Sequence, residues 1–179
     1  MEKEKIPLTI QECLKRKFLV KDAGIIRLNK NYLLKAKNNL ATANILFSLQ
    51  SNQKVREILS IPMNYSSDDW VIITSYYAMY AGALSLLAKI GYKSSNHSAT
   101  ILALEKFYVE KQLIEREFLS MLNYAKITKE EIQELTAAKD NREIAQYSVT
   151  KATTSSLAEI SRNNAFKFIE KVERIIIGV

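Results

Sequence analysis

The chain of 179 residues is long enough for one domain with a sizeable core and too short for two ordinary domains with separate cores. It holds only 4 Gly and 2 Pro, which argues against an all-β protein, and its single Cys13 excludes a disulfide scaffold and a multi-cysteine zinc site. The formal net charge of +7 favours contact with phosphates, although excess lysine also serves solubility.

Apolar residues recur at three- and four-residue steps along most of the chain, which is the period of an amphipathic helix. The helices expected from this pattern, in chain order, cover residues 10–18, 31–49, 55–59, 70–90, 98–108, 113–124, 128–135 and 154–177. Short links between long helices imply antiparallel neighbours. We therefore predict an all-α fold, an antiparallel up-and-down bundle of four to six helices in a single domain over residues 1–179, with residues 1–29 as an N-terminal helical extension.

Several of these helices carry signals at their ends. Thr9 and Glu12 form a capping-box pattern that opens the first helix. Residues 66–69, Ser-Ser-Asp-Asp, supply an N-cap and an acidic first turn for the helix over 70–90, and Gly91 suits its C-terminal end. This helix is apolar nearly all round, which predicts a place in the centre of the bundle or an interface on its second face. A second capping-box pattern is expected to start a helix at Thr128.

The N-terminal residues are highly charged and lack the apolar run of a signal peptide. Polar residues interrupt the apolar stretches well before the ~20 residues of a membrane-spanning helix. We therefore expect no contact with a membrane and a location in the cytoplasm.

His97 is the one histidine, which excludes metal sites with two or three histidine ligands, and we expect neither a metal nor a cofactor. No glycine-rich phosphate-binding loop occurs in the chain. His97 lies just before an expected helix start, where it has two interpretations. It is part of a phosphate-binding or proton-transfer site, or, as we favour, it ties the connector to a neighbouring helix by hydrogen bonds.

Tyr76, Tyr77 and Tyr80 are neighbours on the surface of one expected helix. Aromatic residues at this spacing are more often core residues than a platform for stacking bases. Their hydroxyl groups need partners when buried, so they are candidates for an interface or for the margin of a pocket.

Arg142 and Tyr147 belong to the most suggestive polar segment. Five residues correspond to about 500° around a helix axis, so the two side chains converge only if a turn intervenes or across a dimer. The structural alternative is an arginine paired with Asp140 or Glu143.

Two sequence blocks carry a resemblance to a known family. Residues 75–80 read Ser-Tyr-Tyr-Ala-Met-Tyr, residues 86–92 read Leu-Leu-Ala-Lys-Ile-Gly-Tyr, and His97 follows. This pattern resembles one branch of the HEPN superfamily (higher eukaryotes and prokaryotes nucleotide-binding). Residues 12–17 and 104–111 continue the resemblance, which covers nearly the whole chain.

The resemblance implies a bundle of four or more helices, in which residues 50–65 are a local insertion. It also implies a homodimer and a partner, a minimal nucleotidyltransferase encoded with it as a toxin–antitoxin pair. Many members are metal-independent ribonucleases with an Arg-x4–6-His motif. There the imidazole moves the proton of the 2′-hydroxyl and the arginine stabilises the phosphate.

Carried over residue by residue, Arg142 matches the arginine of the motif, whereas Tyr147 stands at the histidine position. A phenol is a poor base at neutral pH, so the resemblance implies no catalytic residue here and a module that binds nucleotide or RNA. Arg142 would contact phosphate, and Tyr147 and Asn141 would orient it. Tyr77, Tyr80 and His97 complete the expected binding residues. Two alternatives stay open: a ribonuclease that uses Arg142 with His97, and a purely structural bundle.

Overall fold

The computed structural model describes residues 9–139 and 147–178, and within them the chain is predominantly helical. The α-helices are α1 (Ile10–Lys15), α2 (Asn29–Ser51), α3 (Gln53–Ile58), α4 (Asp68–Lys89), α5 (His97–Leu104), α6 (Arg116–Lys139) and α7 (Tyr147–Ile177). A 3-10 helix, η1 (Ala23–Leu28), precedes α2, and a π-helical turn, η2 (Glu105–Val109), extends α5. Strands β1 (Leu19–Lys21) and β2 (Tyr92–Ser94) pair antiparallel. The predicted all-α helical bundle is thus confirmed.

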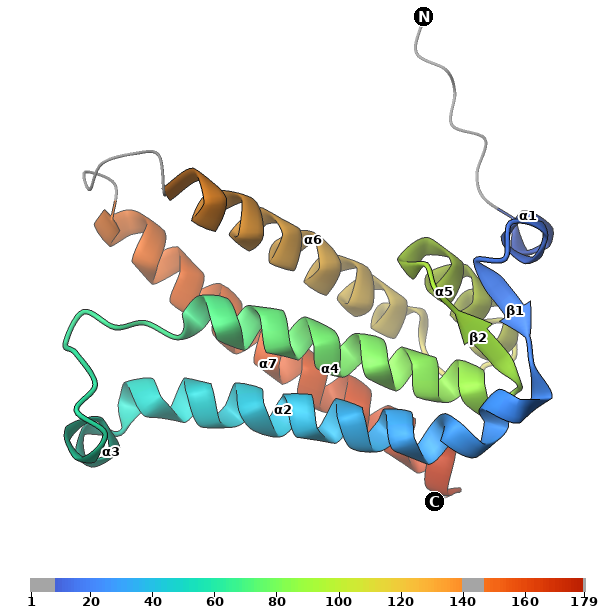
Figure 1. The fold of residues 1–179 in the computed structure, drawn as a ribbon, viewed down its shortest axis with the longest axis horizontal. Coiled ribbons are helices and arrows are strands. Elements are labelled where there is room, and N and C mark those ends of the chain that lie inside the picture. Colours follow the sequence, from blue (N-terminus) through green and yellow to red (C-terminus); the bar gives the residue numbers. More distant parts are fainter. Residues whose placement is uncertain (1–8, 140–146, 179) are drawn as a thin grey trace, which may run out of the picture.

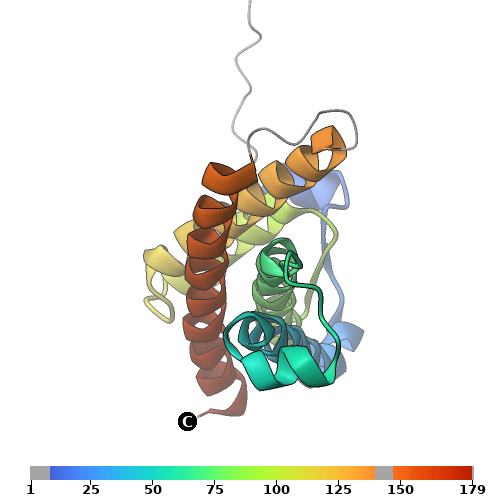
Figure 2. The ribbon, with the colours of Figure 1, turned by 90° about the vertical axis from the view of Figure 1, so that its left-hand side faces the viewer.

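The four long helices α2, α4, α6 and α7 form the bundle (Figure 1). Along the chain they run alternately up and down, as predicted, and α4 lies between α2 and α6 with α7 against it (Figures 1 and 2). The short elements α5, β1 and β2 gather at one end, beside the C-terminal half of α4 (Figure 1).

Helix α4 is the core helix of the bundle. Many of its side chains are fully buried, among them Val71, Met79 and Leu86. Gly82 allows α7 to approach closely, because a Cβ atom there would lie 2.7 Å from the Cδ1 atom of Ile169. Within the described part of the chain, α4 is the one helix long and apolar enough to cross a membrane, but 72% of its apolar window is buried in the fold. Most of this apolar surface therefore packs against other parts of the fold.

The helix ends confirm most of the predicted capping. The Thr9 hydroxyl accepts from the backbone N–H of Glu12, and the Glu12 carboxylate accepts from the Thr9 N–H, which completes the capping box. Gly91 follows α4 with a φ of +76°, a conformation that glycine adopts without strain. The Ser67 hydroxyl does not cap α4. It donates to the Leu46 carbonyl of α2 at 2.8 Å instead.

One predicted helix boundary is wrong. The expected helices over 113–124 and 128–135 are parts of the continuous helix α6. Thr128 is 2% exposed, and its hydroxyl donates back to the Tyr124 carbonyl at 3.0 Å. A threonine that makes this bond sits inside a helix and does not start one, so the capping-box pattern was misleading here.

Two further differences lie near the small sheet. The first helix ends at Lys15 and not at residue 18, because Lys17 turns the chain with a φ of +57°. The backbone N–H of Phe18 then bonds the Cys13 carbonyl at 2.9 Å. The strands that follow, β1 and β2, were not predicted, since three residues are too few for an alternating pattern to be recognised.

Candidate functional site

Three tyrosines and the one histidine meet where α4, α5 and α6 come together. Tyr76, Tyr77 and Tyr80 come from α4, and His97 is the first residue of α5. We call these four residues the aromatic cluster. The Tyr76 and Tyr80 rings stack with centroids 5.9 Å apart, and Tyr80 stacks on His97 at 5.8 Å. The structure therefore brings together three of the predicted binding residues, Tyr77, Tyr80 and His97.

The helical register of α4 and the start of α5 explain this arrangement. Tyr76 and Tyr80 are four residues apart, which places their rings one turn apart on the same face. The side chain of Asn96 accepts from the N–H of Ala99 at 3.1 Å, so it caps α5 and fixes the position of His97 beside those rings.

His97 is poorly satisfied by its surroundings. Its Nδ1 atom lies 3.5 Å from the hydroxyl of Tyr76, which is long for a hydrogen bond. Its Nε2 atom is buried, and no side chain or backbone group in the described part of the chain bonds it. The expectation that His97 ties the connector down by hydrogen bonds thus rests on one weak contact.

The electrostatic surroundings keep His97 neutral at pH 7. Burial, assisted by the positive charge of Lys126 and opposed by Glu130, lowers the pKa of His97 to about 4. An imidazole with this pKa is a weak base and carries no charge at neutral pH. It can still donate one hydrogen bond and accept another.

Tyr76 holds its proton firmly for a similar reason. Burial raises its pKa to about 12, with Tyr80, Tyr77 and Glu130 adding to the effect. The phenol is thus a hydrogen-bond donor over the whole physiological range. Both shifts move these groups away from the pKa near 7 that suits a general base at neutral pH.

Lys129 adds a positive charge to the aromatic cluster. Its Nζ atom lies 5.4 Å from the ring centroid of Tyr76 and 5.8 Å from that of Tyr77, within the range of cation–π attraction. The Tyr77 side chain remains 45% exposed. A partly exposed aromatic ring beside an ammonium group suits a ligand with an aromatic base and a phosphate.

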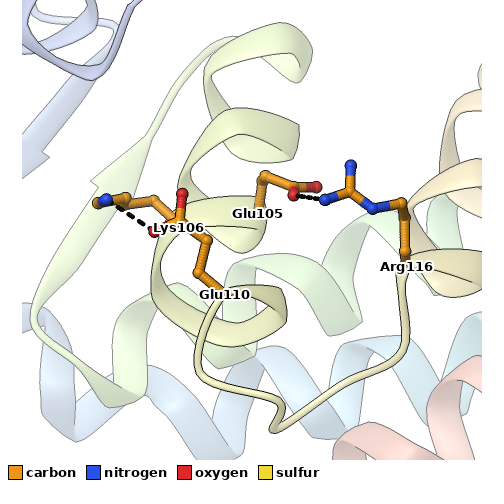
Figure 3. Close-up of polar contacts among 4 residues, drawn as sticks. All are labelled: Glu105, Lys106, Glu110 and Arg116. Carbon is orange, nitrogen blue, oxygen red and sulfur yellow. Dashed lines mark hydrogen bonds and ion pairs between the residues drawn. The ribbon is translucent and has the colours of Figure 1, made fainter.

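A groove of about 480 Å³ begins at His97 and continues between α5 and α6. Its lining mixes apolar and polar side chains: His97, Ser98, Ile101, Leu102, Glu105, Arg116, Leu119, Ser120 and Asn123. At the end away from His97, the guanidinium of Arg116 forms an ion pair with the carboxylate of Glu105 (Figure 3). In Figure 3, Lys106 and Glu110 pair with each other on the other side of the same turn.

The remaining predicted binding residues cannot be placed. Asn141 and Arg142 lie outside the described residues. Tyr147 is the first residue of α7, and its side chain also lies outside them. Among the described residues, no three His, Cys, Asp or Glu side chains group closely enough to hold a metal ion.

Three basic residues of α6 were not among the site residues predicted from the sequence: Arg116, Lys126 and Lys129. Their spacing in steps of three or four, together with Ser120 and Asn123, forms a polar row that winds along a helix. This signal was lost because two separate helices were expected over this part of the chain.

Comparison of the chain with family models, with curated proteins and with solved structures finds no match. The resemblance to the HEPN superfamily therefore stays a prediction that rests on residues 75–80, 86–92 and His97.

Proposed function

We propose that the chain is a HEPN-like, non-catalytic module that binds the base and phosphate of a nucleotide or of RNA at the aromatic cluster. The observation that carries the proposal is Lys129 lying against Tyr76 and the exposed ring of Tyr77. A base stacks on Tyr77, and the adjacent phosphate is neutralised by Lys129 and Lys126. The net charge of +7 adds long-range attraction for such a ligand.

The chemistry of His97 supports binding without cleavage. A general base works best when its pKa lies near the working pH, and the pKa of His97 is lowered to about 4. By resemblance, Arg142 adds a phosphate contact, and Tyr147 and Asn141 orient it.

By the same resemblance, the module works as a homodimer and with a minimal nucleotidyltransferase in a toxin–antitoxin-like pair. The charged N-terminal residues and interrupted apolar stretches favour the cytoplasm as its location. Light scattering on the purified protein measures the homodimer directly. Co-expression with the nucleotidyltransferase, where a gene for one lies beside that of this chain, tests the pairing.

Binding is measured by fluorescence anisotropy with a labelled single-stranded RNA of eight nucleotides. We expect Lys129→Ala to weaken binding and to lower the slope of log affinity against log salt by about one. Tyr77→Ala removes a stacking contact worth about 1–3 kcal/mol per base, so we expect a loss of roughly five- to a hundredfold.

Lys37→Ala is the matched control. Lys37 is also a partly exposed helix lysine, but it pairs with Glu173 on the side formed by α2 and α7. Equal effects of Lys37→Ala and Lys129→Ala would mean that binding is only a matter of overall charge. Absence of RNA or nucleotide binding by the unaltered protein would refute the proposal.

A cleavage assay in the presence of a chelator separates the module from a ribonuclease. We expect intact RNA after prolonged incubation. Cleavage that disappears in both Arg142→Ala and His97→Ala would show that the protein is the ribonuclease of the alternative.

A further inference from the structure

The groove between α5 and α6 is continuous with the aromatic cluster, because His97 belongs to both. Along α6, the polar and basic residues recur at steps of three or four: Arg116, Ser120, Asn123, Lys126 and Lys129. At about 100° per residue, Arg116, Ser120 and Asn123 share the side of α6 that lines the groove. The row then winds around the helix, so that Lys129 stands about 140° from Arg116 around the axis. Thirteen residues separate Arg116 from Lys129, which at 1.5 Å per residue corresponds to about 20 Å.

The chemistry of this path changes along its length. A positive charge stands at each end, with Lys129 beside the tyrosines and Arg116 at the far end of the groove. Between them, the groove offers hydroxyl and amide groups from Ser98, Ser120 and Asn123. A ligand that fits this pattern has several negative charges spaced along a chain and polar groups between them.

Glu105 holds Arg116 in the absence of such a ligand. The two side chains form an ion pair (Figure 3). The Arg116 side chain is 73% exposed and that of Glu105 is 24% exposed. An exposed ion pair of this kind contributes at most about 1 kcal/mol. A phosphate group accepts two parallel hydrogen bonds from a guanidinium. It can therefore replace the Glu105 carboxylate as the partner of Arg116.

We propose that the groove extends the site into a binding path for single-stranded RNA of about six nucleotides, with Arg116 as its distal phosphate contact. This inference rests on the proposed function, since Tyr77 and Lys129 hold one end of the ligand. At 3.4 Å per stacked nucleotide, a path of about 20 Å corresponds to about six nucleotides. Ser98, Ser120 and Asn123 are suited to bond the 2′-hydroxyl groups that distinguish RNA from DNA. The carboxylates of Glu105 and Glu130 oppose the ligand and limit its affinity.

A length series tests the path. Labelled single-stranded RNAs of two, four, six, eight and ten nucleotides are titrated against the full chain by fluorescence anisotropy. We expect affinity to rise with length to about six nucleotides and then to level off. A DNA of six nucleotides is expected to bind more weakly than the RNA of the same sequence.

Two variants test the distal contact. Arg116→Ala is expected to weaken the six-nucleotide RNA about tenfold and to lower its salt slope by about one, but to leave the two-nucleotide RNA unchanged. Glu105→Gln frees the guanidinium and is expected to tighten binding of the six-nucleotide RNA. The controls are Lys106→Ala and Glu110→Gln, which remove the neighbouring ion pair of the same turn and are expected to leave binding unchanged.

The outcomes separate this inference from the proposed function. The extended binding path is refuted if the chain binds two nucleotides of RNA as tightly as six, or if Arg116→Ala and Lys106→Ala have the same effect on binding. Either result leaves the proposed binding at the aromatic cluster intact. Equal binding of RNA and DNA would refute the choice of RNA. If no RNA binds at any length, both proposals fail.

Discussion

His97 is expected to titrate at about pH 4, well below the ordinary histidine pKa of 6.5. The main cause is burial against Tyr76 and Tyr80, which removes water from the imidazolium. The ammonium of Lys126 acts in the same direction, and the carboxylate of Glu130 acts against it.

This shift makes the stability of the fold depend on pH. The unfolded chain takes up a proton on His97 as the pH falls below 6.5, whereas the folded chain does so only near pH 4. The contribution of neutral His97 to the free energy of unfolding is therefore fully present above pH 6.5, and it is lost as the pH falls from 6.5 to 4. At 1.36 kcal/mol for each factor of ten, the ceiling is about 3 kcal/mol. Because His97 is only partly buried, solvent screening reduces this, and we expect about 1–2 kcal/mol.

The assay is direct because the chain has a single histidine. Its imidazole signals in a heteronuclear NMR spectrum, followed from pH 8 to 3.5, give the pKa and the tautomer without assignment of other residues. Urea unfolding of the protein and of His97→Gln at pH 7 and pH 4.5 measures how much His97 contributes to the free energy of unfolding at each pH. Aspartates and glutamates titrate in both proteins, so the difference between the two isolates His97. A pKa between 6 and 7 would refute the buried, neutral histidine, and with it our argument against proton transfer.

Two further predictions concern the packing of α4. Tyr108→Phe is expected to lower stability by about 1–3 kcal/mol, since its buried hydroxyl donates to the Leu86 carbonyl at 2.6 Å and the carbonyl loses that partner. The melting temperature should fall by about 2–4 °C for each kcal/mol of stability lost. The control Tyr124→Phe, which alters an exposed ring, should leave the melting temperature almost unchanged. Asp68→Ala is expected to cost about 2 kcal/mol or more in urea unfolding, because three side chains donate to this carboxylate, which is 1% exposed. Asp69→Ala is the control, and equal losses for the two aspartates would contradict this assignment.

Much of the fold could be predicted because helical periodicity is a local property of the chain. The scarcity of Gly and Pro, the all-round apolar character of α4 and the position of Gly91 each pointed to the observed arrangement. The break predicted before Thr128 was wrong because a capping-box pattern has the same residues whether or not the helix continues. The helix continues because Thr128 is buried and its hydroxyl bonds the preceding turn.

The candidate site was only partly predictable. Tyr77, Tyr80 and His97 were singled out by residue type and by the family resemblance, but Lys129 and Arg116 were not. Their importance depends on the approach of α6 to α4 and α5, which brings together residues far apart in the sequence. No local pattern encodes such an approach.

The sequence by itself determined that this protein is helical, where most of its helices lie, and that it has a single histidine. Only the tertiary structure decided that this histidine is half-buried among the tyrosines, that burial lowers its pKa, and that a groove continues from it along α6. The physical reason is that periodicity and capping act over a few residues. Burial, pKa and the shape of a groove depend instead on which helices pack together.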